Sequence, residues 1–306
     1  MSSERWKVAD EVARALAAHR PVVALETTVV THGLPAPEGV AVARAMEDAV
    51  TAAGAVPATV GLLDGFVRVG LAAADLDRLA ATPDGPKRNL SNFAGALVAR
   101  GTGSTTVAAT MLVAHRSGIP VFATGGIGGV HRGVQETDDV SADLTALASI
   151  PVAVVCSGAK AILDLPRTME RLETLGVPVY GWRCDEFPAF WRRSSGIRLD
   201  QRFDDMATLA AAIREHHALV TGTGVLVANP VPEADELDED MYQRGLDGAT
   251  EMVASQGIRG REVTPFMLDF IRMVTGGEVV RSNVALLKDN ARVAGELSVA
   301  LAALGR

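Results

Sequence analysis

The sequence predicts a single α/β domain over residues 1–306, built on a mostly parallel mixed sheet with helices on both faces. Short apolar runs rich in β-branched residues, such as residues 21–25 and 151–156, are typical of strands that are buried on both faces. Longer segments with helical apolar spacing separate these runs, and such an alternation indicates a parallel sheet. The sequence has no repeat, and no linker in it is strong enough to divide the chain into domains.

The expected elements follow in chain order. Helices are expected at 6–18, from Pro37 to about 53, and at 104–117, 141–149, 159–175, 204–216 and 283–304. Strands are expected at 21–25, 56–62, 66–69, 120–124, 151–156, 177–182 and 219–228. Asp64-Gly65 is a favourable hairpin turn between two of these strands, and Ser282 or Asn283 would cap the last helix. Loops are expected at 82–92 and 125–133, and the acidic segment 230–240 is expected to be an exposed excursion.

Composition excludes several classes of protein. A chain of 306 residues with 48% apolar content can bury a sizeable core. The formal net charge of −8 and the lack of a lysine- or arginine-rich tract argue against nucleic acid and membrane partners. No apolar run approaches the roughly 20 residues that span a bilayer. The acidic residues Glu4, Asp10 and Glu11 interrupt the segment where the apolar core of a signal peptide would lie. Cys156 and Cys184 are typical of a reducing compartment, so a cytoplasmic protein is expected.

Lys160 lies just after the apolar strand 151–156, in the expected first turn of the next helix. Open α/β sheets bind ligands at the carboxyl ends of their strands. The partial positive charge of a helix N-terminus would disfavour the ammonium form, and a neutral amine beside a cleft is what Schiff-base chemistry needs. The alternative, which position alone favours, is a structural lysine whose stem covers apolar surface.

Glu26 follows the strand 21–25 within an apolar, threonine-rich run. An unpaired carboxylate is costly to bury, and burial would raise the pKa of Glu26 toward a value useful for a general acid. A structural salt bridge is an equally compatible alternative.

The glycine-rich loop 125–133 follows a strand and contains His131 and Arg132. Its backbone N–H groups could cradle an anion, with Arg132 adding positive charge; a flexible tight turn is the alternative. The loop is not a dinucleotide fingerprint, because no helix opens directly from it and the later acidic residue is missing. No Gly-Lys-Ser/Thr sequence follows, so it is not a P-loop either.

Asp138, Asp139 and Asp143 crowd around Ser141. Their repulsion would need a cation or a helix N-terminus to relieve it. Oxygen ligands without a His/Cys cluster suggest Mg²⁺ or Mn²⁺, held by one or two carboxylates together with water and substrate phosphate. Helix-capping aspartates are the alternative.

Residues 103–107, Gly-Ser-Thr-Thr-Val, lie at the start of the expected helix 104–117. Their hydroxyl and N–H groups, with the charge of Lys87, would suit a phosphate or the edge of a sugar. A helix cap and a surface lysine are the alternatives.

Long motifs are spread over the chain from about residue 8 to the C-terminus. They are Leu-Glu-Thr-Thr at 25–28, Thr-His-Gly-Leu-Pro at 31–35, Gly-Ala-Val-Pro-Ala-Thr at 54–59, Thr-Thr-Val-Ala-Ala-Thr-Met at 105–111, Phe-Ala-Thr-Gly-Gly-Ile-Gly-Gly-Val-His-Arg-Gly at 122–133, Asp-Val-Ser-Ala-Asp-Leu at 139–144, Gly-Ala-Lys-Ala-Ile-Leu-Asp at 158–164, Leu-Glu-Thr-Leu-Gly-Val-Pro at 172–178, Glu-Phe-Pro-Ala-Phe at 186–190, Asn-Pro at 229–230 and Thr-Pro-Phe at 264–266. In these motifs the chain strongly resembles the pseudouridine-5′-phosphate glycosidase family, which is related to the indigoidine synthase A group. One departure is residues 87–92, Lys-Arg-Asn-Leu-Ser-Asn, where the family usually has a basic stretch that ends in aspartate.

The resemblance implies a lyase with glycosidase activity, which reversibly cleaves pseudouridine 5′-phosphate to uracil and ribose 5-phosphate in pseudouridine catabolism. It implies Glu26 as the proton donor, Lys160 as the covalent nucleophile and Asp139 as the ligand of Mn²⁺, with Mg²⁺ or another divalent ion as an alternative. The substrate contacts expected from the resemblance and from their neighbours are Lys87, Thr106, Val107, His131, Ser141, Ala142, Asp143 and Asn283. The resemblance also implies the indigoidine synthase A-like architecture and a homotrimer.

The expected chemistry differs from that of ordinary glycosidases because a C-glycoside has no leaving-group lone pair to protonate. Glu26 would protonate the ring oxygen, and Lys160 would trap C1′ of the opened ribose as an imine, from which uracil departs after protonation of its C5. Two alternatives remain open. One is another lysine-dependent phosphosugar lyase of the indigoidine synthase A type, and the other is a non-catalytic phosphosugar-binding protein.

Overall fold

A ten-stranded sheet forms the centre of the fold in the computed structural model, which describes residues 3–34, 38–82, 85–220, 222–258, 260 and 263–305. The strand order is β1-β4-β3-β2-β6-β7-β10-β8-β9, and β5 pairs with β3 beside this path. The strands are β1 Trp6–Val8, β2 Val22–Leu25, β3 Val56–Leu63, β4 Phe66–Val69, β5 Gly103–Ser104, β6 Val121–Ala123, β7 Ala153–Cys156, β8 Val179–Trp182, β9 Gln201–Phe203 and β10 Val225–Ala228. Among the described strands, the antiparallel pairs are those of β3 with β4 and of β3 with β5. This confirms the expected mostly parallel mixed sheet.

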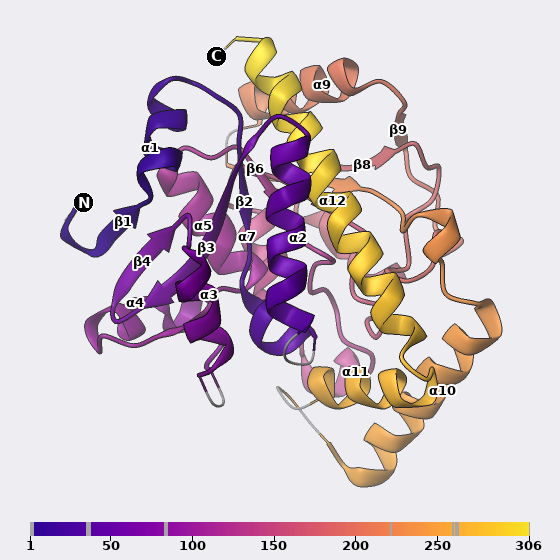
Figure 1. The fold of residues 1–306 in the computed structure, drawn as a ribbon. Helices are drawn as coiled ribbons and strands as arrows, with labels where there is room; N and C mark the ends of the chain where they lie inside the picture. Colours follow the sequence, from indigo (N-terminus) through magenta and orange to yellow (C-terminus); the bar gives the residue numbers. More distant parts are fainter. Residues whose placement is uncertain are drawn as a thin grey trace.

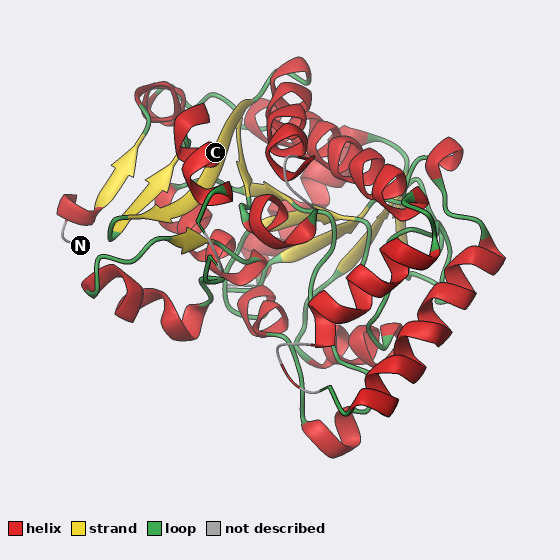
Figure 2. Ribbon diagram, turned by 60° about the horizontal axis from the view of Figure 1, so that its bottom comes forward, coloured by secondary structure: helices red, strands yellow, loops and turns green. Residues whose placement is uncertain are grey.

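The helices lie on both sides of the sheet (Figure 2). They are α1 Asp10–Ala17, α2 Glu38–Ala52, α3 Ala73–Ala80, α4 Leu90–Val98, α5 Val107–Ser117, α6 Val134–Thr137, α7 Ala142–Leu147, α8 Leu165–Thr174, α9 Met206–Leu219, α10 Glu239–Gln256, α11 Val263–Val274 and α12 Glu278–Ala303. Helices α2 and α12 lie side by side in front of the sheet in Figure 1, and α5 and α7 pack together behind it. Among the described helices, none is both long enough and apolar enough to cross a bilayer.

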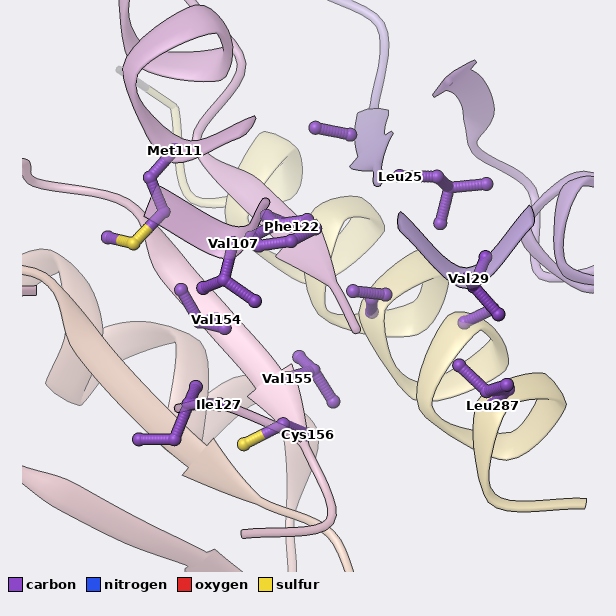
Figure 3. Packing of buried hydrophobic residues seen from close by; sticks show 14 of the residues in the cluster. Leu25, Val29, Val107, Met111, Phe122, Ile127, Val154, Val155, Cys156 and Leu287 are labelled. Atoms are coloured by element: carbon purple, nitrogen blue, oxygen red, sulfur yellow. The ribbon is translucent and has the colours of Figure 1, made fainter. Parts of the chain in front are cut away.

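The core follows from the alternation of side chains along each strand. Val154 of β7 points toward Val107 and Met111 of α5, whereas Val155 points to the side on which Leu287 of α12 lies (Figure 3). Every residue of β2, β6, β7 and β10 is buried. Helices cover both faces of these strands, and this explains their unbroken apolar sequences.

The register aligns the carboxyl ends of the central strands. Leu25 of β2 pairs with Ala123 of β6, and Ala123 in turn pairs with Val155 of β7. Val155 also pairs with Val227 of β10. The residues that follow these strands therefore lie along one edge of the sheet, as expected of a parallel arrangement.

The hairpin turn is confirmed, since Asp64 and Gly65 join antiparallel β3 and β4 with positive φ angles of 53° and 76°. Both residues thus have the left-handed backbone that a two-residue hairpin favours.

Several expected boundaries are wrong. Residues 6–8 form a short strand beside β4 instead of beginning a helix. The expected strand 219–228 begins only at Val225, because α9 continues to Leu219. Segment 230–240 is not an exposed excursion throughout, since Val231 and Leu237 anchor it in the core. Pro37, residues 83–84 of the expected loop and residue 221 lie outside the described residues.

Five of the described α-helices lie outside the expected set, namely α3, α4, α6, α10 and α11. Helix α4 occupies part of the expected loop 82–92, and a reciprocal capping box between Asn89 and Asn92 begins it.

Candidate active site

The ends of three neighbouring strands bring Glu26, Thr124 and Lys160 together. Glu26 follows β2 and is only 8% exposed, and the hydroxyl of Thr124, just after β6, donates a hydrogen bond to its Oε1. Lys160 lies in the loop after β7, and its Nζ donates to the carbonyl oxygen of Gly126 at 2.7 Å. The strand-end placement of both expected catalytic groups is confirmed.

Lys160 does not lie in a helix, contrary to expectation. Helix α8 begins at Leu165, after the side chain of Asp164 accepts a hydrogen bond from the N–H of Arg167. The Lys160 loop is instead held by backbone hydrogen bonds to the glycine-rich loop, from Lys160 N to Ile127 O and from Ile127 N to Gly158 O, both 3.0 Å long. The charge of a helix N-terminus therefore does not explain a neutral amine at Lys160, as had been expected.

A cavity of about 360 Å³ opens at this edge of the sheet. Of the expected site residues, Glu26, Lys160 and Asn283 line it. Side chains of α11 and α12 form one wall, and the turn Val29–Gly33 contributes to another. Asn283 lies within α12, which begins at Glu278, so neither Asn283 nor the buried Ser282 caps that helix.

The electrostatics of the cavity favour a protonated carboxyl. Burial raises the pKa of Glu26, and the nearby charge of Asp143 adds to this effect. The positive charge of Lys160 and the hydroxyl groups of Thr124 and Thr28 partly oppose it. Among the described residues Glu26 forms no ion pair within 4.0 Å, so the structural salt-bridge alternative is not supported.

Lys87 lies beside the N-terminus of α5. The next residue, Arg88, accepts a backbone hydrogen bond of 3.0 Å from Thr106 N. Burial lowers the pKa of Lys87, and the charge of Lys160 lowers it further, whereas Glu26 and Asp143 act in the opposite direction. Lys87 is thus half-buried and close enough to Glu26 and Lys160 to interact with them. The alternative interpretation of Lys87 as a surface lysine is excluded.

Thr106 and Val107 begin α5. The side chain of Thr106 caps the helix by accepting a hydrogen bond of 3.3 Å from Ala109 N, so the cap alternative describes this residue. Val107, the first helical residue, is buried. Residues 103–104 are not helical but form β5.

Asp143 is a structural carboxylate rather than a member of an acidic cluster. It is 7% exposed, and its two oxygens accept hydrogen bonds from Ala108 N at 3.0 Å and Gly128 N at 2.8 Å. These bonds join the start of α5 to the glycine-rich loop. Ser141 caps α7, and its hydroxyl oxygen would clash with a Cβ atom at position 128, which explains the glycine there. Ala142 is the half-buried first residue of α7.

Asp138 is exposed, and Asp139 is paired with His131. Asp139 Oδ2 lies 4.0 Å from His131 Nδ1, and the two backbones are joined by a hydrogen bond of 3.0 Å from His131 N. Burial lowers the pKa of His131, as does the charge of Lys160, while Asp139 opposes this effect.

No group of three or more His, Cys, Asp or Glu residues forms a metal-binding cluster in the part of the chain described. The expected grouping of Asp138, Asp139 and Asp143 is therefore wrong. Asp139, with a 37% exposed side chain, could still hold a hard cation as its one carboxylate ligand. Mg²⁺ and similar ions are often bound in this way, with water and substrate oxygens as the remaining ligands.

Most of the N–H groups that were expected to bind an anion in the glycine-rich loop form hydrogen bonds within the protein instead. The N–H groups of Ile127, Gly128, Val130 and His131 donate to other protein atoms. Arg132 lines a separate cavity of about 540 Å³ beside α10. The loop thus positions Lys160 and Asp143 more than it offers free donors.

Some residues of the site have no role in the sequence-based prediction. His32 lines the cavity, and burial together with the charge of Lys87 lowers its pKa to about 4, so its ring is neutral at pH 7. Asn290 of α12 is fully buried behind the strand ends and contacts Thr124 and Ser157. Apolar residues lie three and four positions before and after it, at 286, 287, 293 and 294, so an asparagine on this apolar helix face is the sequence signal that could have revealed it.

Residues 11–300 match the sequence family described as indigoidine synthase A like protein. A pseudouridine-5′-phosphate glycosidase of Methylobacterium nodulans is 54% identical over 293 residues, which cover 96% of this chain and 87% of that protein. The protein of the same name from Solibacter usitatus is 48% identical over 295 residues, which cover 96% of this chain and 99% of that protein.

Two solved structures share the fold. The prealnumycin C-glycosynthase AlnA, in complex with ribulose 5-phosphate, has a TM-score of 0.91 and 41% identity, covering 98% of this chain and 97% of that one. An indigoidine synthase A-like protein of Thermotoga maritima has a TM-score of 0.87 and 34% identity, covering 97% and 96%. With this fold and these relatives, the chain belongs to the indigoidine synthase A-like family and is a relative of the pseudouridine-5′-phosphate glycosidases.

Proposed function

We propose that this protein cleaves the C1′–C5 bond of pseudouridine 5′-phosphate and releases uracil and ribose 5-phosphate. The observation that carries the proposal is that a buried carboxyl, Glu26, and an amine, Lys160, line the same cavity. Ordinary glycosidases use two carboxyl groups instead. The relatives named pseudouridine-5′-phosphate glycosidase, and the ribulose 5-phosphate complex of AlnA, support a phosphosugar substrate.

The first step would open the ribose ring. Glu26 donates its proton to the ring oxygen O4′, and the C1′–O4′ bond breaks as electrons from the uracil ring form a double bond between C5 and C1′. The amine of Lys160 then adds to C1′ and returns the electron pair to the uracil ring. Burial of Glu26 supports this role, because its raised pKa favours a carboxyl that carries a proton to donate.

The second step would release uracil. After C5 is protonated, the nitrogen lone pair of Lys160 forms a C=N bond to C1′ as the C1′–C5 bond breaks. The electron balance therefore requires the imine to form during this cleavage and not before it. Water then adds to C1′, and loss of the amine gives ribose 5-phosphate and free Lys160.

The direct test is to incubate the wild-type protein with pseudouridine 5′-phosphate and identify both products by chromatography and mass spectrometry. Uracil and ribose 5-phosphate in equal amounts are expected. A smaller carbon fragment would favour a different lysine-dependent lyase, and binding without turnover would favour a phosphosugar-binding protein.

Lys87 would bind the 5′-phosphate at the N-terminus of α5, where Thr106 and Val107 lie. Residues 141–143 and His131 would complete the substrate contacts, with Asn283 on the opposite wall. We expect pseudouridine without its phosphate to be a poor substrate, because binding energy from the phosphate positions C1′ against Lys160.

Lys87→Met should lower kcat/KM for the nucleotide by about 10- to 10²-fold, since a charge-assisted hydrogen bond is typically worth about 1.5–3 kcal/mol. The same change should alter kcat/KM for the unphosphorylated nucleoside far less. Steady-state kinetics with both substrates check this. An equal loss for both would contradict the phosphate contact.

Asp139 would hold Mn²⁺, or Mg²⁺ in its place, and the cation would supply positive charge to the substrate phosphate. We expect Asp139→Ala to weaken Mn²⁺ binding and to raise KM for the nucleotide. Electron paramagnetic resonance of free Mn²⁺ during titration measures the binding without turnover.

Asp138→Ala is the matched control, because it removes the same charge from the exposed neighbouring position. Full activity in excess chelator, or equal Mn²⁺ affinity in the two variants, would refute the metal site.

The proposal includes a cytoplasmic location and a homotrimer. Both cysteines are free and buried, which supports a reducing compartment. The trimer is carried over from the family resemblance, and analytical ultracentrifugation would check it.

A further inference from the structure

Asn290 lies at the point where three parallel strands end. It belongs to α12 and is fully buried. Its Nδ2 donates to the carbonyl oxygen of Thr124, just after β6, at 2.9 Å, and to Ser157 Oγ, just after β7, at 3.1 Å. Its Oδ1 accepts from Asn229 Nδ2, just after β10, at 2.9 Å. One side chain therefore connects three strand ends to a helix.

The contacts of Asn290 fix the orientation of its amide group. Turning the amide over would place its oxygen against the carbonyl oxygen of Thr124 and its NH₂ against the NH₂ of Asn229. Asn229 is itself held, because it also donates to Asp289 Oδ2 at 2.9 Å. A buried network in which every member is satisfied resists displacement of any one of them.

Two of the three residues that Asn290 contacts, Thr124 and Ser157, lead directly to the catalytic pair. The hydroxyl of Thr124 donates to Glu26 Oε1, which leaves the other carboxyl oxygen to carry the acidic proton. Ser157 begins the loop that carries Lys160, and Ser157 N donates to Gly125 O at 2.9 Å. Lys160 in turn donates to Gly126 O. Asn290 thus anchors both the residue that hydrogen-bonds to Glu26 and the start of the loop that carries Lys160.

We propose that Asn290 is a positioning residue that sets the distance and orientation between the proton donor Glu26 and the amine of Lys160. It acts through Thr124 and Ser157 and has no place among the residues that line the cavity. This inference rests on the proposed function, in which these two groups must act on the same ribose.

A purely structural role for Asn290 would lower stability without affecting Glu26. Besides burial, the groups that influence the titration of Glu26 are Lys160, Thr124, Thr28 and Asp143. Of these, Thr124 is the residue that Asn290 contacts directly, through its backbone carbonyl oxygen. The Thr124 hydrogen bond lowers the pKa of Glu26, so loosening it should move the titration of that carboxyl to higher pH.

The test compares Asn290→Leu, Thr124→Val and their double variant with the wild type. Leucine has the same branched arrangement of side-chain heavy atoms as asparagine but cannot form hydrogen bonds. The matched control is Ser298→Ala on the same helix, because Ser298 is also buried and donates to a strand carbonyl, Val22 O, at 3.1 Å, but outside the cavity. Asn290→Ser, whose hydroxyl is polar but too short to span the same contacts, replaces the leucine variant if that variant does not fold.

Two measurements are made on each variant. Carbon-13 NMR of labelled glutamate carboxyls, assigned with Glu26→Gln, gives the pKa of Glu26 without any substrate. Uracil release gives kcat and KM. We expect Asn290→Leu to raise the pKa of Glu26 in the same direction as Thr124→Val, and to lower kcat by about 10²-fold with a smaller change in KM. The double variant should show less than the sum of the two shifts.

The positioning role is overturned if the Glu26 titration of Asn290→Leu matches the wild type and kcat falls no more than in Ser298→Ala. Failure of the wild type to release uracil would refute the proposed function instead. The carboxyl titration would then still decide whether Asn290 controls Glu26.

Discussion

Lys160→Ala is expected to abolish uracil release, with a loss of about 10⁴-fold or more, while leaving the protein folded. The side chain supplies the nitrogen that must bond to C1′, and no neighbouring atom of the loop can replace it. Its removal leaves the backbone hydrogen bonds of the loop in place, since these involve Lys160 N and not its side chain. Uracil release measures the first effect, and circular dichroism with thermal unfolding measures the second.

The covalent adduct locates the nucleophile independently of turnover. Treatment of the wild type with ribose 5-phosphate and borohydride should trap a secondary amine on Lys160, which intact-mass and peptide mass spectrometry would identify. Lys87 is the serious competitor, because it is half-buried near the same cavity and its pKa is lowered. Lys87→Met should therefore still form the adduct, as should Lys288→Ala on the exposed side of α12. An adduct on Lys87 would transfer the nucleophile role to that residue.

Glu26→Gln is expected to lower kcat by about 10²- to 10⁴-fold, the range typical of lost general acid catalysis. Glutamine retains the shape of the side chain and can accept the Thr124 hydrogen bond but has no proton to donate to O4′. KM should change much less, so a complex with intact pseudouridine 5′-phosphate should accumulate in this variant and be observable by crystallography.

The pH profile gives a second signature of Glu26. The general acid must be protonated, so kcat/KM of the wild type should fall as the pH rises through the pKa of Glu26. Burial raises that pKa above 4.5, which places this limb at higher pH than for an exposed glutamate. The limb should be absent from the profile of Glu26→Gln.

Glu47→Gln is the matched control for Glu26. Burial also raises the pKa of Glu47, and the hydroxyl of Thr59 donates a hydrogen bond to its carboxylate. Glu47 differs from Glu26 in that it does not line the cavity. It should retain kcat and the wild-type pH profile. Near wild-type kcat in Glu26→Gln would show that another group, such as His131 or Asp143, delivers the proton.

Strand patterns predicted the site better than helix patterns did. Continuous apolar runs located β2 and β7, and the parallel arrangement then placed Glu26 and Lys160 at one edge of the sheet. The helix expected at 159–175 failed because Ala159, Ile162 and Leu163 have helical spacing but are buried by loop packing. Asp164 as a cap and Pro166 in the first turn were the local signals of the true start of α8.

Contacts between distant segments were not predictable from local pattern. The proximity of Asp143 to Asp138 and Asp139 in the sequence suggested a shared cation, whereas Asp143 bonds to backbone groups 15 and 35 residues away. Asn290 lies 166 residues from its partner Thr124. Neither pairing has a sequence signal beyond the cost of burying a polar group, which requires some partner but does not identify it.

The position of α12 has a consequence for the order in which the chain can fold. This helix, residues 278–303, packs on α2 and on the central strands β2, β6 and β7. It follows every described strand in the sequence, so the nascent chain exposes one apolar face of its central strands until α12 has been made. Contacts of such long sequence separation form slowly, and exposed strand faces promote aggregation. Completion of the core and assembly of the Glu26–Lys160 pair thus depend on the same event, the docking of α12 on strands that precede it in the sequence.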